Sequence, residues 1–393
     1  MLERLAEQPP DPLLAVIGMF RTDPRPWKID LGVGVYRDES GRTPVMRAVK
    51  AAEARLLETQ DTKAYVGPGG DLVFIDLMRD LVFGGEAPAG RLVGLQTPGG
   101  TAALRAAADL LARAGARTIW AGRPTWANHD PIFAAAGLEL RSYDYFDPVA
   151  QTVAFDRMAA ALERSAVGDV VLLQASCHNP TGADLSPEQW AAVADLVRSR
   201  RLIPLIDVAY QGVGRGLEAD VAGVRQVVAV AEEALVAVSC SKTFGLYRER
   251  TGAVFTLTAD AGGRTAATSN MLAIARANYS MPPDHGAAVV RTILEDPDLT
   301  REWRAELDGV RGRIRAVRAL LAGFGRCGGL DLVPLAAQNG MFSQLPLDEA
   351  QIRRLREDHA IYMTASGRVN LAGLKVEDVE PLIRALTAVF EAA

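Results

Sequence analysis

Short apolar runs alternate with longer helical segments from about Arg91 to Thr258, and this alternation restricts the possible folds more than any other feature of the sequence. It is typical of an α/β doubly wound, mostly parallel sheet. In such sheets ligands bind outside the carboxyl ends of the strands, so the residues that follow each strand are the candidates for chemistry. The expected elements are strands at Thr118–Ala121, Val170–Ala175, Ile203–Val208 and Leu235–Ser239 and a helix at Thr101–Ala114.

The last part of the chain has a different pattern. After Pro297 a long charged helical stretch, Arg301–Leu321, leads into a glycine-rich break and a mixed α+β tail. A length of 393 residues also exceeds what one hydrophobic core usually supports. We therefore predict a large domain of residues 45–308 and a smaller α+β domain made of residues 1–44 and 309–393.

The composition argues against several classes of protein and site. A net charge of −5 without long runs of like charge disfavours a nucleic-acid partner. The sequence shows no signal-peptide pattern and no membrane-spanning apolar stretch, so we expect a cytoplasmic protein without membrane contact. Cys177, Cys240 and Cys327 form no Cys-x-x-Cys pair and are expected to be buried free thiols. The four histidines lack metal-ligand spacing, so no metal site is predicted.

A lysine follows the last predicted strand. Lys242 comes directly after the apolar run Leu235–Ser239 and is flanked by two hydroxyl side chains. Most lysines are solvated, but one held beside a buried strand is desolvated, which lowers its pKa and makes it a usable nucleophilic amine. Ser239, Ser241 and Arg250 could together bind a phosphate, with the arginine giving a charge-assisted contact.

Polar groups also follow the other strands. Asp207 ends an apolar strand, where a carboxylate needs a cationic or proton-donating partner, although a helix cap or a salt bridge would also account for it. Asn179-Pro180 taken alone is an ordinary turn. The segment Thr97–Leu104 places two glycines and a threonine before a helix, which suits a phosphate but is also a routine helix cap.

Read together in order, these motifs resemble the fold type I enzymes that use pyridoxal 5'-phosphate (PLP), and specifically the aspartate/aromatic branch of the class I aminotransferases. The resemblance covers nearly the whole chain, and many co-linear motifs at consistent spacing make it highly specific. It implies an enzyme that transfers amino groups between amino acids and 2-oxo acids. The similar segments are Ile29–Tyr36, Tyr65–Gly67, Thr97–Thr101, Pro124–His129, Cys177–Gly182, Asp207–Gly212, Ser239–Tyr247, Arg276–Ser280 and Ala365–Asn370.

The resemblance assigns a complete cofactor site. It implies that Lys242 forms a Schiff base with PLP and then carries the proton between the substrate Cα and the cofactor. Asp207 would pair with the pyridine nitrogen and keep it protonated, so that the ring acts as an electron sink. Tyr210 and Asn179 would hydrogen-bond the ring oxygen, and Trp126 would stack on the ring. The implied phosphate ligands are Gly100, Thr101, Ser239, Ser241, Arg250 and, from a second subunit, Tyr65.

The same resemblance implies a homodimer with shared active sites. Arg368, in the small domain, would bind the substrate α-carboxylate, and Gly34 lies in the segment that would close over it. Trp126 and Asn179 would also contact the substrate. Arg276, donated across the dimer, would bind the distal carboxylate of aspartate or glutamate, which implies 2-oxoglutarate as the amino acceptor.

Two departures from the family pattern, at Met281 and Ala64, bear on the amino donor. Met281 stands where aspartate-specific members carry an asparagine, and Ala64 replaces a polar residue beside Tyr65, so the rim of the pocket is more apolar. Gln174 replaces a histidine near the cofactor. The apolar rim favours an aromatic amino acid as donor, with aspartate also used; the alternative is an aspartate aminotransferase.

Other function classes fit less well. PLP β-lyases and decarboxylases use the same fold, but the presence of both Arg276 and Arg368 favours a transaminase. A non-enzymatic regulator would need a DNA-binding module, and the residues before Ile29 are too few for one. A nicotinamide-dependent dehydrogenase is disfavoured because no strand is followed by the Gly-x-Gly-x-x-Gly motif.

Overall fold

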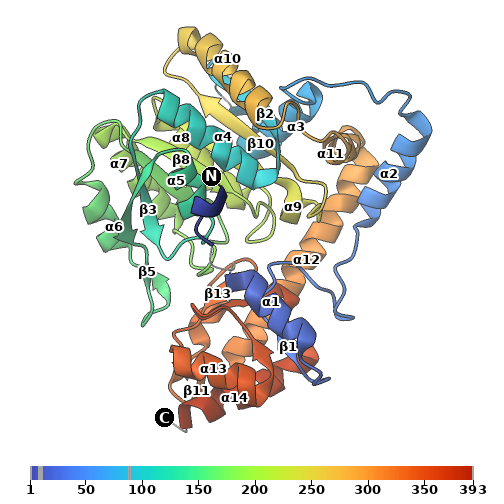
Figure 1. The fold of residues 1–393 in the computed structure, drawn as a ribbon, viewed down its shortest axis with the longest axis vertical. Coiled ribbons are helices and arrows are strands. Elements are labelled where there is room, and N and C mark those ends of the chain that lie inside the picture. The colour runs from blue at the N-terminus through green and yellow to red at the C-terminus, as the bar shows by residue number, and fades with distance from the viewer. Residues whose placement is uncertain (1, 8–11, 87, 89, 392–393) are drawn as a thin grey trace.

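In the computed structural model, the described residues (2–7, 12–86, 88 and 90–391) contain a seven-stranded sheet in the order β2-β10-β9-β8-β7-β3-β4 (Figure 1). Strand β10 is antiparallel to both of its neighbours, and the other pairs are parallel. This mostly parallel sheet confirms the predicted fold class. The strands are β2 (Leu92–Pro98), β3 (Thr118–Arg123), β4 (Glu139–Asp144), β7 (Val170–Gln174), β8 (Ile203–Val208), β9 (Ala234–Ser239) and β10 (Thr251–Leu257).

Helices cover both faces of the sheet. Along β7, Val171 and Leu173 pack into one hydrophobic core, whereas Val170 and Leu172 pack into a second core on the opposite face. Strands buried on both faces read as continuous apolar runs, which is why this strand and its neighbours could be found from the sequence. The first core includes α3 (Leu72–Phe83), α6 (Phe155–Leu162), α7 (Pro187–Arg200), α8 (Ala222–Val230) and α11 (His285–Glu295), and the second includes α4 (Gly99–Arg113), α5 (His129–Ala135) and α10 (Ala261–Asn278).

A third core lies away from the sheet and contains segments from both ends of the chain. The long helix α12 (Pro297–Gly323) runs from the sheet to this core (Figure 1). Its Trp303 and Leu307 belong to the first core and its Val317 and Leu321 to the third. The predicted domain boundary at residues 308 and 309 lies within this helix and stays a prediction. The remaining elements of the third core include β1 (Ile29–Asp30), which pairs with β14 (Ile361–Tyr362), and the helices α13 (Glu349–His359) and α14 (Val379–Glu391).

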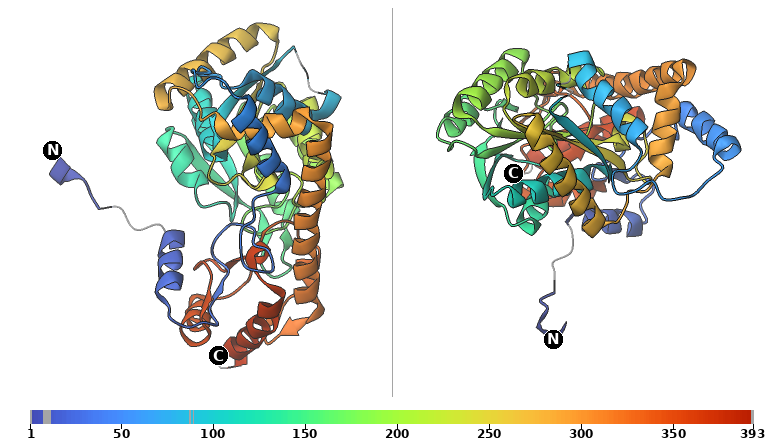
Figure 2. Two further views of the ribbon diagram at one scale, coloured as in Figure 1. Left: turned by 90° about the vertical axis from the view of Figure 1, so that its right-hand side faces the viewer. Right: turned by 90° about the horizontal axis from the view of Figure 1, so that it is seen from above.

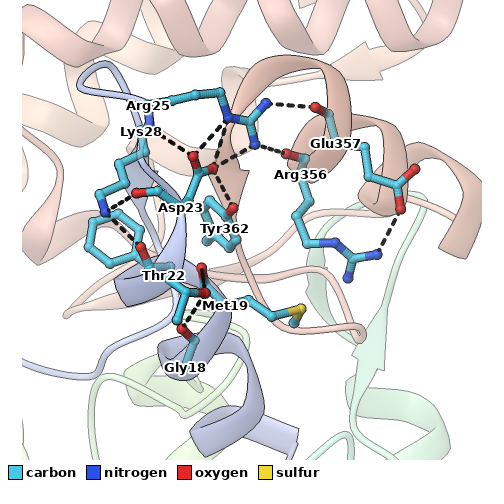
Figure 3. A network of polar contacts seen from close by, with 10 residues as sticks. Gly18, Met19, Thr22, Asp23, Arg25, Lys28, Arg356, Glu357 and Tyr362 are labelled. Carbon is cyan, nitrogen blue, oxygen red and sulfur yellow. Dashed lines mark hydrogen bonds and ion pairs between the residues drawn. The ribbon is translucent and has the colours of Figure 1, made fainter.

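The amino-terminal region is fastened to this third core through Asp23. Its carboxylate accepts hydrogen bonds from the Arg25 guanidinium at 2.6 Å and from the Tyr362 hydroxyl at 2.5 Å (Figure 3). These bonds, chiefly those from Arg25, hold the pKa of Asp23 well below its usual range. Arg25 also donates to two backbone carbonyls near the end of α13. The segment that follows α1 (Pro12–Thr22) is therefore held against the carboxyl-terminal part of the chain.

One prediction about the side-chain inventory can be compared with the structure. Cys177, Cys240 and Cys327 are buried free thiols, as predicted. Across the described part of the chain, no cluster of three or more His, Cys, Asp or Glu side chains is arranged to hold a metal ion. Within that same part, no helix is both long enough and apolar enough to cross a membrane.

Arg318 of α12 is a buried charged side chain, with 1% of its surface exposed. Burial lowers its pKa to about 10. The guanidinium compensates for its burial by filling backbone acceptors of the loop that leads into β13 (Phe342–Gln344), and so holds that loop against α12. It donates to the carbonyls of Leu335, Asn339, Gly340 and Phe342 and to the hydroxyl of Ser343.

Replacing Arg318 with lysine tests this role, because a lysine keeps the charge but cannot span acceptors arranged around a planar guanidinium. We expect Arg318→Lys to lower the free energy of unfolding by about 3 kcal/mol, since buried acceptors that lose their donors cost about 1–3 kcal/mol each. Chemical denaturation measures this loss, with Arg315→Lys at an exposed position of the same helix as control. Equal stability of the two variants would contradict the role.

Candidate active site

The carboxyl ends of β7, β8 and β9 open into a cavity of about 290 Å³. A separate hollow of about 320 Å³ lies near the starts of β8 and β9, between α4 and α10, and contains none of the predicted site residues. The cavity at the carboxyl ends of the strands is lined in part by Leu13, Leu104, Gln174, Ala209 and Phe342. The predicted residues that line it are Gly34, Gly100, Thr101, Trp126, Asn179, Asp207, Tyr210, Ser239, Ser241, Lys242, Arg250 and Arg368.

Lys242 projects into the cavity from a rigid segment. Strand β9 ends at Ser239, and the short helix α9 (Cys240–Thr243) begins at the next residue. The last carbonyl of α9 accepts a hydrogen bond of 2.9 Å from the indole of Trp303. That indole also stacks on the ring of Phe244, with centroids 4.5 Å apart. The backbone on both sides of the lysine is thus fixed by the sheet and by α12.

The surroundings of Lys242 make its ammonium group easier to deprotonate. Burial is the main cause that lowers its pKa to about 8, the positive charges of Arg250 and Arg368 add to the lowering, and the negative charge of Asp207 opposes it. The ammonium lies 5.0 Å from the centre of the Tyr210 ring. An amine that loses its proton near pH 8 is a far better nucleophile at neutral pH than an ordinary lysine.

Asp207, 8% exposed at the end of β8, has a histidine as its hydrogen-bond partner. Nε2 of His129 lies 3.1 Å from Asp207 Oδ2, and the imidazole is fully buried at the start of α5. Its ring packs edge-on against Trp126 and stacks with Phe133. The sequence analysis assigned no role to His129, although two signals pointed to it: its place in the segment Pro124–His129 and the need of Asp207 for a donor.

Asn179 and Tyr210 present polar atoms to the same cavity. The Asn179 side-chain nitrogen lies 3.4 Å from the Tyr210 hydroxyl. Its amide oxygen is buried and has no hydrogen-bond partner in the part of the chain that the structure describes. Burial, reinforced by the charge of Asp207, raises the pKa of Tyr210, so the phenol stays protonated and can donate. The pair is therefore available to hydrogen-bond a ligand.

The start of α4 forms a cradle for an anion. The first N–H groups of a helix have no partner within it, and they attract negative charge. A Cβ atom at Gly99 would lie 2.6 Å from Arg250 Nη2, and one at Gly100 would lie 3.0 Å from Ser239 Cβ. Only glycines allow the guanidinium and the serine to come so close to the helix. Free N–H groups, hydroxyls and an arginine are the donors that a phosphate requires, so the cavity fits PLP.

Arg368 brings a second cation to the cavity from the carboxyl-terminal part of the chain. It lies on β15 (Arg368–Asn370), which pairs with β13. Its guanidinium lies 4.6 Å from the centre of the Phe342 ring and donates a 2.9 Å hydrogen bond to the Gly32 carbonyl. Gly34 also lines the cavity beside this arrangement. A planar guanidinium here is suited to binding a carboxylate.

Two predicted site residues lie outside the cavity. Tyr65 is 92% exposed, and Arg276 is exposed near the end of α10. Both were predicted to act across a dimer, so a single chain does not test their roles. Those roles stay predictions.

The lowered pKa of Lys242 gives a direct prediction. Its amine should become reactive with a midpoint near pH 8, well below the 10.5 usual for lysine, because only the neutral form attacks an electrophile. Reductive methylation of the protein at a series of pH values, read by mass spectrometry of peptides, measures the midpoint. Lys50, exposed on α2 (Arg47–Thr59), is the comparison. The same pH dependence at both lysines would show that burial does not activate Lys242.

Comparisons with known proteins agree with this geometry. Residues 26–386 match the family model for aminotransferase class I and II. The chain is 58% identical to a tyrosine aminotransferase of Rhizobium meliloti (strain 1021) and 45% identical to an aspartate aminotransferase of Escherichia coli (strain K12), in each case over 99% of this chain and 100% of the relative. A solved aromatic-amino-acid aminotransferase from Burkholderia pseudomallei, covalently bound to pyridoxal phosphate, matches with a TM-score of 0.96 at 39% identity, over 99% of each chain. The chain therefore belongs to the class I and II aminotransferases, a family of PLP-dependent enzymes.

Proposed function

We propose that the protein transfers the amino group of an aromatic amino acid, and also of aspartate, to 2-oxoglutarate. The observation that carries this proposal is a single cavity that joins a desolvated lysine, a buried acid, an anion cradle and a carboxylate-binding arginine. Relatives named for tyrosine and for aspartate support both donor classes. Glutamate and the corresponding 2-oxo acid are the products.

The residues of the cavity would hold PLP at three points. Ser239, Ser241 and Arg250, with the start of α4, would bind the phosphate. Asp207 would bind the pyridine nitrogen, and Trp126 would cover one face of the ring. When bound, PLP supplies an electron sink for the negative charge that develops as the amino acid loses its Cα proton.

The chain itself would supply the proton transfer. Lys242 would bind the cofactor covalently in the resting enzyme, and its Nζ, once released, would take the proton from the substrate Cα and return one to the cofactor side. The low pKa of this amine suits a group that must accept and give up a proton near neutral pH. Tyr210 would donate a hydrogen bond from its protonated hydroxyl and thereby help to orient the ring.

The substrate would lie between Arg368 and an apolar wall. The guanidinium of Arg368 would bind the α-carboxylate, which fixes the Cα near Lys242. Leu13, Leu104 and Phe342 line the same cavity and give an aromatic side chain a place to pack. Closure of the segment around Gly34 over the substrate would exclude water.

We further propose a homodimer in which each subunit completes the site of the other with Tyr65 and Arg276. Large apolar side chains near Tyr65 in the sequence are exposed, including Leu57 at 87% and Leu72 at 67%. The first described segment, with the helical turn Leu2–Arg4, stands apart from the body of the molecule (Figure 2). Exposed apolar surface of this kind is characteristic of association between subunits.

The donor specificity is tested with a panel of amino acids and 2-oxoglutarate. We expect kcat/KM for tyrosine or phenylalanine to lie within about tenfold of that for aspartate, a difference of about 1.4 kcal/mol, because Met281 and Ala64 are predicted to make the rim of the shared site more apolar. Met281→Asn should shift the ratio toward aspartate. Lys242→Ala provides the background rate. Turnover of aspartate alone would reject the aromatic assignment in favour of an aspartate aminotransferase.

The shared site is tested by hybrid dimers of two variants that are each inactive with aspartate. Lys242→Ala lacks the amine, and Arg276→Ala lacks the arginine for the distal carboxylate. In a hybrid, one of the two sites combines Lys242 with Arg276 of the partner subunit, so about half of the wild-type aspartate activity should return. Hybrids purified with two different affinity tags measure this. Hybrids as inactive as their parents would refute the exchange of residues between subunits.

A further inference from the structure

We propose that Gln96 is a positioning residue for the active site of the partner subunit, because it holds the two segments of its own subunit that carry Tyr65 and Arg276. The inference rests on the proposed function, in which these two side chains complete the site across the dimer. Gln96 lies on β2, at the edge of the seven-stranded sheet. Its side chain is completely buried.

Two hydrogen bonds attach the segment that follows Tyr65 to Gln96. The side-chain oxygen of Gln96 accepts one of 2.8 Å from the backbone N–H of Asp71. Edge strands carry backbone groups that need partners outside the sheet, and the Gln96 N–H donates one of 3.1 Å to the Gly69 carbonyl. Gly70 has a φ of +77°, and a Cβ atom there would lie 2.3 Å from Gln96 Oε1, so only glycine allows this approach. The exposed run that contains Tyr65 therefore ends at a fixed point on the sheet.

The other end of the Gln96 amide attaches the turn that follows α10. Gln96 Nε2 donates a hydrogen bond of 2.9 Å to the carbonyl of Pro283. The same turn contains Ser280, whose hydroxyl accepts a 2.5 Å hydrogen bond from Arg276, and Met281, which is predicted to lie at the rim of the shared site. The backbone that presents Arg276 is thus held by α10 on one side and by Gln96 on the other.

A single amide group therefore fixes the two segments relative to each other. A backbone N–H can only donate and a carbonyl can only accept, so both atoms of the amide are assigned by their partners. A second link joins the same regions, since Gln60 Nε2 lies 3.4 Å from Asp284 Oδ2. Breaking either bond of Gln96 would leave buried polar atoms unpaired, which makes the relative position of the two segments costly to change.

A rival role for Gln96 lies within its own subunit. Strand β2 leads directly into the anion cradle at Gly99 and Gly100. The turn into that cradle is held by a different side chain, because the Thr97 hydroxyl donates a 3.1 Å hydrogen bond to the Gly99 carbonyl. Successive side chains of a strand point to opposite faces, so the Gln96 amide and the Thr97 hydroxyl act on different neighbours. We therefore expect the amide to matter for the site of the partner subunit.

Hybrid dimers with a single functional lysine separate the two roles. In every PLP-loaded hybrid one chain carries Lys242→Ala, so only the lysine of the other chain can act. Gln96→Met keeps the length of the side chain without its polar atoms. It is placed either in the chain that lacks the lysine, which gives the trans hybrid, or in the chain that keeps it, which gives the cis hybrid. The reference hybrid has Gln96 in both chains.

We expect kcat/KM for aspartate to fall about tenfold in the trans hybrid and to equal the reference in the cis hybrid. The reason is that the functional site of the trans hybrid receives Tyr65 and Arg276 from the altered chain. Phenylalanine lacks the distal carboxylate that Arg276 is proposed to bind, so its kcat/KM should fall less. Gln96→Asn keeps an amide but is too short to reach both segments, and it should give the same pattern if chains with Gln96→Met do not fold.

Three results would overturn the role of Gln96. Equal losses in the cis and trans hybrids would show that it stabilises the subunit as a whole. A loss confined to the cis hybrid would show that it acts on its own anion cradle. Reference activity in both would show that the segments keep their places without it. The proposed function is read separately, from the activity of the reference hybrid and from hybrids of Lys242→Ala with Arg276→Ala.

Discussion

The site depends on a carboxylate, that of Asp207, at the end of strand β8. Both faces of this strand are buried, so placing a charged group there costs free energy. Asp207 is 8% exposed, and an acid so placed must have donors. His129 is one of them. The negative charge opposes the loss of the proton from Lys242, while burial and the two arginines favour it, so the amine keeps a pKa of about 8. The negative charge of Asp207 thus limits how far burial and the two arginines lower the pKa of Lys242.

The cavity also depends on elements that lie far apart in the sequence. The sheet supplies Asp207, Lys242 and the anion cradle, whereas Arg368 comes from β15 in the carboxyl-terminal part of the chain. The long helix α12 connects the two, because Trp303 holds the segment after Lys242 and Arg318 holds the loop that carries Phe342. Packing along a single helix therefore helps to set how the lysine and the carboxylate-binding arginine face each other.

The sequence predicted the central strands and most of the residues that line the cavity. Burial explains why some strands could be predicted and others could not. Strands β7 to β9 are apolar runs because both of their faces are buried. Strand β4, mostly exposed at the edge of the sheet, lacks that signal, and neither it nor the antiparallel β10 was predicted. The site residues predicted from distinctive motifs line the cavity, except Tyr65 and Arg276. His129 was missed because its role comes from a contact with Asp207, 78 positions away. The segment Pro124–His129 and the need of Asp207 for a donor were both visible in the sequence, but nothing local joined them.

The central claim is that Lys242 is the residue that holds the cofactor. The direct measurement is borohydride reduction of the PLP-loaded protein, followed by peptide mass spectrometry at each of its five lysines. The account predicts that the cofactor is fixed on Lys242 and that Lys28, Lys50, Lys63 and Lys375 remain unmodified. A cofactor fixed on one of those four, with Lys242 unmodified, would contradict it.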